Sequence, residues 1–166
     1  MTRQHHWQFA IISVMNTISL LDLMTTAYNY PLLEEALAEV RYSDSNYFSL
    51  SLSRTENLEV VLICFSGLQS TKVHTHGESN CVTRCLKGLV NDVSYSLEDD
   101  QLCPCTSTLI KEGEINSTPI GLYHQVANML PNDTSILINF YSPPLPLQED
   151  VYETVSAWGE QDSEID

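Results

Sequence analysis

The residues with the clearest chemical potential are two histidines separated by a single residue, His74 and His76. In a strand-like segment successive side chains point to opposite faces, so residues two apart share a face. Both imidazole rings would then lie at a spacing suited to binding one metal ion. Because histidines two apart also occur without a metal, the pair alone does not establish a site, and the surrounding sequence has to decide.

Two longer patterns include this pair. The first pattern runs through His74, His76, Cys81 and Gly88, and the second runs through Gly113, Pro119, Gly121, His124 and Asn128. Together they resemble the two signature motifs of the cupin superfamily. The second motif fits at every defined position. The first differs in two ways: Cys81 stands where most cupins have a glutamate, and the leading glycine, Gly67, lies one residue farther upstream. The resemblance implies a mainly β fold, a small cupin barrel, with His124 as the third metal ligand.

The exchange of that glutamate for Cys81 resembles the thiol dioxygenases, above all the cysteine dioxygenase family. There the cysteine can form a thioether with a tyrosine beside the iron, and Tyr141, in Tyr141-Ser-Pro-Pro144, is the matching tyrosine. The resemblance extends from about Tyr47 to Pro144. It implies that Cys81 and Tyr141 are catalytic residues, that Fe²⁺ is the cofactor, and that O2 and a small thiol are the substrates.

The residue types suit this chemistry. Three histidines without a carboxylate form a neutral ligand set, so an Fe²⁺ ion held by His74, His76 and His124 would keep a net positive charge that favours an anionic thiolate. Three protein ligands also leave positions open for substrate and oxygen. The same set could instead hold zinc and activate water. The placement of Cys81 and Tyr141 favours iron.

The substrate side departs from the cysteine dioxygenase pattern. In that family an arginine shortly after a tyrosine pairs with the substrate carboxylate; here Tyr47 matches the tyrosine, and Ser49 stands at the arginine position. Serine cannot bind a carboxylate in a bidentate way as arginine does. Arg54 is the candidate replacement, although a surface charge at a turn is the alternative interpretation. Asn139 replaces a histidine before Tyr141; an amide can hydrogen-bond the phenol but cannot exchange protons near neutral pH.

Two helices followed by a barrel of short strands is the architecture that would position these residues. Asn16 or Thr17 is expected to cap a first helix, and Pro31 to open a second. From Tyr47 onward, runs rich in β-branched residues alternate with polar breaks, which favours an antiparallel barrel or sandwich. The predicted strands are 58–65, 81–86, 89–97, 123–126 and 135–141. Loops are expected at the acidic run 98–100 and at Cys103-Pro-Cys105, whose cysteines are too close for a comfortable disulfide.

Length and composition limit the partners. A chain of 166 residues suits one domain, and we expect a helical segment over 1–44, the cupin barrel over 45–148 and an acidic tail over 149–166. Acidic residues outnumber basic ones 22 to 7, which gives a net charge of −15. Because this charge repels phosphate backbones and anionic lipids, we expect no nucleic acid and no membrane as partner. A monomer or weak oligomer is expected.

Five cysteines, an odd number without regular spacing, indicate a reducing compartment, and the cytoplasm is the expected location. The sequence therefore predicts a mononuclear iron dioxygenase that oxidises cysteine or a cysteine-like thiol to its sulfinate. Two alternatives stay open. One is another oxygen-dependent reaction of such a thiol, for example carbon–sulfur cleavage, and the other is a cupin that binds a metal or ligand without turnover.

Overall fold

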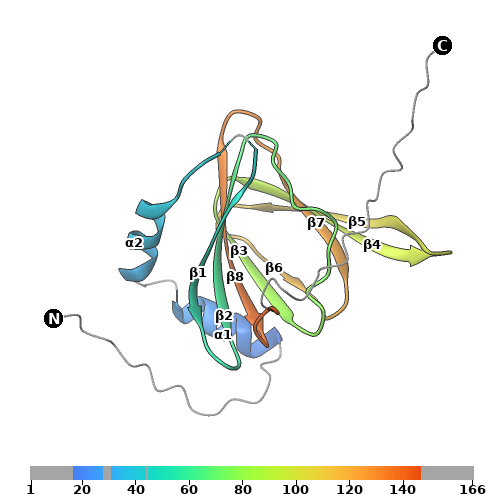
Figure 1. Cartoon of the computed structure of the whole chain (residues 1–166), viewed down its shortest axis with the longest axis horizontal. Coiled ribbons are helices and arrows are strands. Elements are labelled where there is room, and N and C mark those ends of the chain that lie inside the picture. The colour runs from blue at the N-terminus through green and yellow to red at the C-terminus, as the bar shows by residue number, and fades with distance from the viewer. Residues whose placement is uncertain (1–16, 28–30, 44, 147–166) are drawn as a thin grey trace.

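Two antiparallel sheets face each other and enclose the interior of the protein (Figure 1). The computed structural model describes residues 17–27, 31–43 and 45–146. One sheet has the strand order β1 (Phe48–Arg54), β2 (Glu59–Ser66), β8 (Thr134–Ser142), β3 (Asn80–Lys87) and β6 (Ile115–Thr118). The other has the order β5 (Gln101–Lys111), β4 (Leu89–Glu98) and β7 (Tyr123–Asn128). The predicted mainly β fold with short N-terminal helices is confirmed.

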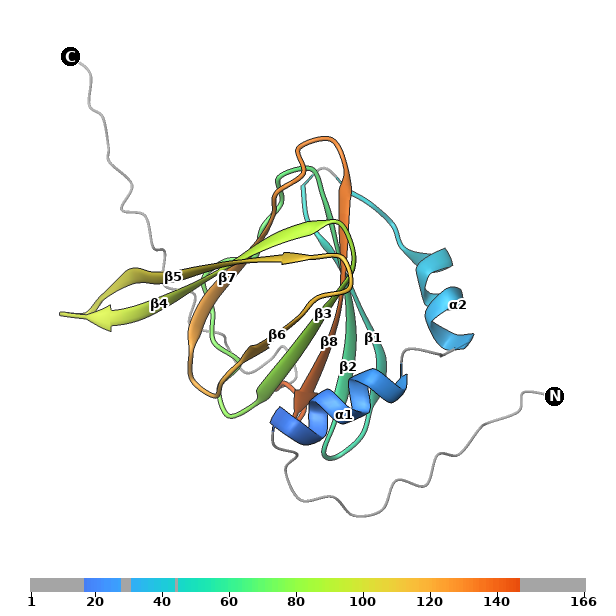
Figure 2. The same ribbon diagram turned by 180° about the vertical axis from the view of Figure 1, so that it is seen from behind.

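The two helices cover the outer face of the larger sheet (Figure 2). Helix α1 (Thr17–Ala27) begins at one of the two predicted caps, and α2 (Pro31–Glu39) begins at the predicted proline. Leu20 and Met24 of α1 are buried against Val82 and Phe140 of the sheet. Ala36 of α2 is buried in a second apolar cluster. Outward-facing apolar residues of β2, β3 and β8 are thereby removed from water, which stabilises the sheet that carries much of the site.

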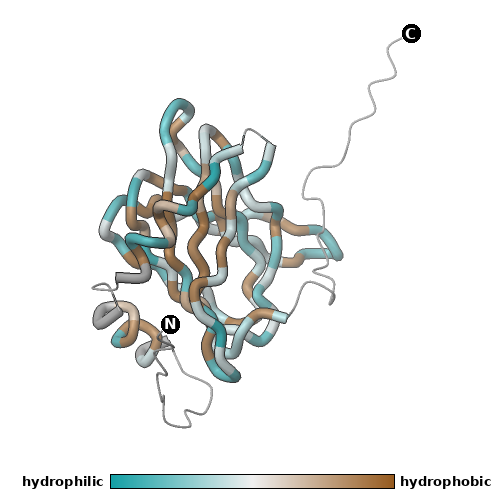
Figure 3. The backbone as a smooth tube through the Cα atoms, turned by 60° about the vertical axis from the view of Figure 1, so that its left-hand side comes forward, coloured by the Kyte–Doolittle hydropathy of each residue, from teal (hydrophilic) through white to brown (hydrophobic). Residues whose placement is uncertain are grey.

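The interior between the sheets is apolar at one end. Residues from both sheets form the buried cluster there: Phe65, Cys85, Val90, Ile110, Val126 and Leu137. The central strands accordingly carry hydrophobic stretches, whereas the connecting turns are hydrophilic (Figure 3). Side chains alternate between the two faces of a strand, so one set from the central strands packs in the interior and the other set packs against the helices. The polar residues of the candidate site must therefore lie toward the other end.

Four of the five predicted strands lie within observed strands, namely β3, β4, β7 and β8, and the fifth, 58–65, begins one residue before β2. The loop expected at Cys103-Pro104-Cys105 is wrong, because these residues lie inside β5. That strand is at the edge of its sheet, where a proline is tolerated, and its pairing with β4 contains an irregularity beside Pro104. The acidic loop is confirmed as the turn of the β4–β5 hairpin, with Asp99 and Asp100 at positive φ.

All five cysteines are free, as the odd and irregular spacing indicated. Strands β1, β5 and β6 were not among the predicted runs. Much of β1 and β5 is polar and exposed, and β6 has only four residues, three of them polar, so all three lack the apolar signal of the central strands. The acidic tail expected over 149–166 lies outside the described residues.

Candidate metal centre

Three histidine side chains, those of His74, His76 and His124, converge in the structure. His124 lies in β7, and His74 is held to it by two backbone hydrogen bonds, from His74 N to His124 O at 2.9 Å and from His124 N to His74 O at 2.8 Å. The Nε2 atom of His76 lies 3.3 Å from Nε2 of His74 and 3.2 Å from Nε2 of His124. The sequence predicted a strand-like segment around His74. The structure instead places His74 in an isolated β-bridge to His124.

Hydrogen bonds on the far side of two rings fix their orientation. His74 Nδ1 donates to the carbonyl oxygen of Lys72 at 2.9 Å, and His124 Nδ1 donates to Oδ1 of Asp92 at 2.9 Å. A carbonyl or carboxylate can only accept, so each Nδ1 carries the proton and each Nε2 keeps its lone pair. Asp92 is itself held, because Asn116 Nδ2 donates to its Oδ2 at 2.8 Å. A carboxylate behind a ligating histidine is a common arrangement in metal sites.

Burial favours the neutral form of the His74 and His76 imidazoles. His76 and His124 are only 3% and 4% exposed. Loss of solvation, together with the smaller effect of the neighbouring His124, lowers the pKa of His74 to about 4. Burial is the largest cause that places the pKa of His76 well below its ordinary value, and the neighbouring His124 and His74 lower it in the same direction. A neutral imidazole is the form that binds a metal.

The separations of His76 Nε2 from the other two Nε2 atoms fit ligands of a single ion, and the ligand atoms of all three histidines lie within 4.8 Å of one another. A metal–nitrogen distance of about 2.0–2.1 Å at tetrahedral or octahedral angles separates the ligand nitrogens by about 2.9–3.4 Å. The observed 3.2 and 3.3 Å fall within that range. Nδ1 of His76 is buried and makes no hydrogen bond with the described residues. The histidine group could therefore hold a metal ion.

Cys81 and Tyr141 lie directly opposite each other on β3 and β8. Both are buried in one cluster with Val61, and the Tyr141 ring lies 5.0 Å from the His76 ring, edge to face. Burial raises the pKa of the Cys81 thiol to about 12, although hydrogen bonds from Thr83 and Tyr141 oppose the shift. Asn139 donates its Nδ2 hydrogen to the Tyr141 hydroxyl at 3.0 Å. The structure thus brings these sequence-predicted residues together beside the histidines.

A charged pair that the strand pattern did not single out continues this row of residues. Glu59 lies opposite Tyr141 in the register of β2 and β8, and Arg54 lies opposite Glu59 in the register of β1 and β2. Glu59 is 6% exposed, and its Oε2 accepts a hydrogen bond from Arg54 Nη1. The sequence did contain a signal for Glu59. It lies two residues before Val61 on β2, and residues two apart on a strand share a face, so the alternation would have placed Glu59 inside the barrel.

The remaining predicted substrate residues lie farther away. Ser49 is exposed on β1 and pairs with Ile63, whose partner on β8 is Leu137. Tyr47 packs against Phe65, with ring centroids 5.3 Å apart. Phe65 pairs with Ser135, six residues before Tyr141 on β8, a separation of about 20 Å along the strand. The structure therefore does not bring Tyr47 to the histidines.

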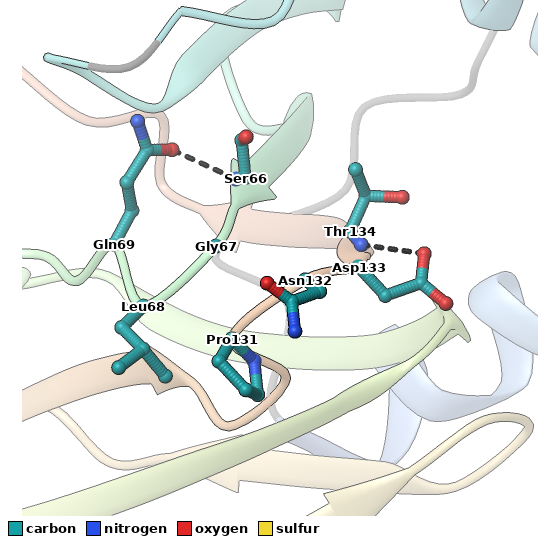
Figure 4. A pocket seen from close by; sticks show the side chains of 8 residues that line it. All are labelled: Ser66, Gly67, Leu68, Gln69, Pro131, Asn132, Asp133 and Thr134. Atoms are coloured by element: carbon teal, nitrogen blue, oxygen red, sulfur yellow. Dashed lines mark hydrogen bonds between the residues drawn. The ribbon is translucent and has the colours of Figure 1, made fainter.

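A hollow of about 540 Å³ opens at that opposite end of the barrel (Figure 4). It lies between the loop after β2 and the loop before β8, and its lining residues are Ser66, Gly67, Leu68, Gln69, Pro131, Asn132, Asp133 and Thr134. Asn128, the last residue of the second motif, ties these loops together by donating to the carbonyl oxygens of Gly67 and Asp133. The lining contains neither histidine nor cysteine, so the hollow is separate from the three-histidine group.

Comparison with protein-family models gives no match. Among solved structures, a Klebsiella pneumoniae protein with a double-stranded β-helix domain superposes with a TM-score of 0.52 at 19% identity, covering 72% of this chain and 87% of that one. The cupin domain of Schizosaccharomyces pombe Cnp3 gives 0.51 at 13% identity, covering 65% and 67%. The chain has a cupin fold. Peruvianin-I from Thevetia peruviana latex, described as a cysteine peptidase, gives 0.57 at 15% identity, covering 80% and 79%.

At these identities the likeness of this chain to other proteins concerns the fold alone. The chemistry has to be argued from its own side chains. Among the described residues, no helix is both long enough and apolar enough to cross a membrane.

Proposed function

We propose that this cupin is a mononuclear non-haem iron dioxygenase that oxidises a small thiol, cysteine or a cysteine-like compound, to its sulfinate. The observation that carries the proposal is the pairing of Cys81 with Tyr141, which lie opposite each other on β3 and β8. The Tyr141 ring is also edge to face with the ring of His76. The resemblance to thiol dioxygenases rests on this same pair. A neutral set of three histidines beside it supports a site for an anionic sulfur ligand.

The reaction balances without any further reductant. A thiol and O2 give a sulfinate and one proton, and both atoms of O2 form bonds to sulfur. Sulfur loses four electrons and dioxygen gains four. The Nε2 atoms of His74, His76 and His124 would hold the iron, which when bound would supply the electronic coupling between thiolate and O2 that the spin-paired products require.

The side chains around the histidines prepare the substrate. The ligands add no negative charge, so the substrate thiol is favoured as the thiolate. The Tyr141 hydroxyl accepts a hydrogen bond from Asn139 and so keeps its own proton for donation. Leu145, after β8, packs on the cluster of Val61, Cys81 and Tyr141 and shields that pair from water. A desolvated pocket strengthens the polar contacts made to a small substrate.

Oxygen consumption tests the proposal. Protein loaded with Fe²⁺ under anaerobic conditions is mixed with each member of a panel of thiols, and O2 uptake and product mass are recorded. We expect uptake with at least one thiol, and with ¹⁸O2 both labelled atoms in the product. The same preparation of His124→Ala should show neither. Uptake without sulfinate would indicate another oxygen-dependent reaction, and binding without uptake would indicate a non-catalytic cupin.

A further inference from the structure

Glu59 places a buried carboxylate at the metal end of the interior. On β2, Glu59 shares its face with Val61, which packs against Cys81 and Tyr141, whereas Val60 faces α1. Its partner in register on β8 is Tyr141. The side chain of Glu59 is 9% exposed and that of Arg54 is 35% exposed. The carboxylate is therefore the inner member of the ion pair, and the guanidinium is the outer one.

Arg54 is already committed to other partners. Its Nη1 donates to Glu59 Oε2, and its Nη2 donates to the backbone oxygen of Leu145, both at 2.5 Å. A substrate carboxylate bound in a bidentate way needs two parallel N–H groups of one guanidinium. In this structure one hydrogen of Nη1 is donated to Glu59 and one of Nη2 to the segment after β8, and the positive charge of the guanidinium is matched by the carboxylate of Glu59. A thiol that carries a carboxylate would also approach Glu59, a group of like charge.

Glu59 keeps capacity for another donor. A carboxylate has about four acceptor positions. Two hydrogen bonds are made to it here, from Ser51 Oγ to Oε1 at 3.0 Å and from Arg54 to Oε2. A protonated amine donates up to three hydrogen bonds and carries the opposite charge. Its head group therefore complements the remaining acceptor positions.

We propose that Glu59 determines specificity by binding a cationic amine, so that the substrate is an aminothiol whose thiol reaches the three histidines. This inference rests on the proposed thiol chemistry and adds the substrate class. Ser49 stands at the position where the resemblance expects an arginine, and Arg54, the candidate replacement, is paired with Glu59. Both observations agree with a substrate that does not rely on a carboxylate.

Anaerobic thiol binding to the Co²⁺-loaded protein tests the inference without turnover. Cysteamine, 2-mercaptoethanol and 3-mercaptopropionate have the same two-carbon spacing and end in a cation, a neutral hydroxyl and an anion. Binding is followed by the thiolate-to-cobalt absorption band. We expect wild type to bind cysteamine at least about tenfold more tightly than 2-mercaptoethanol, as one charge-assisted hydrogen bond allows, and 3-mercaptopropionate most weakly.

Glu59→Gln keeps the shape of the side chain and removes its charge. We expect it to abolish the advantage of cysteamine and to leave 2-mercaptoethanol within about twofold of wild type. Glu56→Gln is the matched control, because Glu56 is exposed on the turn between β1 and β2 and should change nothing. If Glu59→Gln does not fold, the wild-type order decides by itself.

Three results overturn the inference. They are equal binding of the three thiols by wild type, a wild-type preference for 3-mercaptopropionate, and a cysteamine advantage that survives in folded Glu59→Gln. Each of these leaves the proposed thiol chemistry standing, because the thiols still bind the metal. If none of the thiols produces the absorption band, the proposed function fails together with the inference.

Discussion

Replacing Asp92 by asparagine should weaken metal binding although no ligand is lost. Asp92 accepts from His124 Nδ1 at 2.9 Å and from Asn116 Nδ2 at 2.8 Å, and it is 8% exposed. An asparagine of the same shape has one donating end. If the NH2 group of the asparagine faces His124, it opposes the N–H at Nδ1 and favours the tautomer with the proton on Nε2. If it faces Asn116, it opposes the NH2 group of that residue. Either orientation leaves a buried conflict that only rearrangement can relieve.

Loss of such a partner behind a ligating histidine costs about 10- to 100-fold in metal affinity, or about 1.4–2.8 kcal/mol. Competition between Asp92→Asn and a chromogenic chelator for Co²⁺ measures this change. Asp133→Asn is the control, because Asp133 lies on the surface at the opposite end and pairs with Lys87. An affinity equal to that of wild type in Asp92→Asn, alongside a large loss in His124→Ala, would refute the argument that Asp92 orients His124.

Three further outcomes are expected. Gly88→Ala should destabilise the protein by more than about 3 kcal/mol in urea unfolding, because Gly88 has φ +91° and a Cβ there would lie 2.8 Å from the backbone oxygen of Thr134; Gly113→Ala, with φ +84° and open space, should cost less. After turnover with iron, peptide mass spectrometry should find Cys81 linked to Tyr141 by a thioether in wild type but not in Cys81→Ser, and its complete absence would contradict this pairing. The metal-free protein should lose on the order of 3 kcal/mol from His74 as pH falls from about 6.5 to 4, because the unfolded state takes up the proton first; unfolding midpoints that stay constant over this range would be inconsistent with it.

The sequence was sufficient for the parts of the fold that carry strong local signals. The central strands have apolar runs, and α2 has a proline at its first position, so both were predicted. Strand β5 was not, because its proline, its two cysteines and its exposed polar residues contain no alternation. Its strand state comes from pairing with β4, a tertiary contact that local propensity does not report.

The candidate site divides in the same way. Motif spacing was enough to name His74, His76 and His124, and the structure brings all three together. Asp92 was missed, because a single acidic residue in a chain with 22 of them has no distinguishing pattern, and Glu59 was missed although its alternation with Val61 was available as a signal. Tyr47 was named by its place in a resemblance, but the register of β2 with β8 sets its neighbour Phe65 at the far end of the barrel. Register depends on long-range pairing.

The departures from the cysteine dioxygenase pattern share a physical logic. Ser49 lacks the cation expected there, and the interior instead carries the carboxylate of Glu59 with Arg54 on its outer side. Asn139 lacks a titratable proton, but its N–H donates to the Tyr141 hydroxyl, which leaves the hydroxyl proton available for donation to another group. The residues nearest the histidines thus favour one fixed hydrogen-bond direction and one sign of substrate charge. A substrate that needs neither a carboxylate partner nor a proton relay fits both substitutions at once.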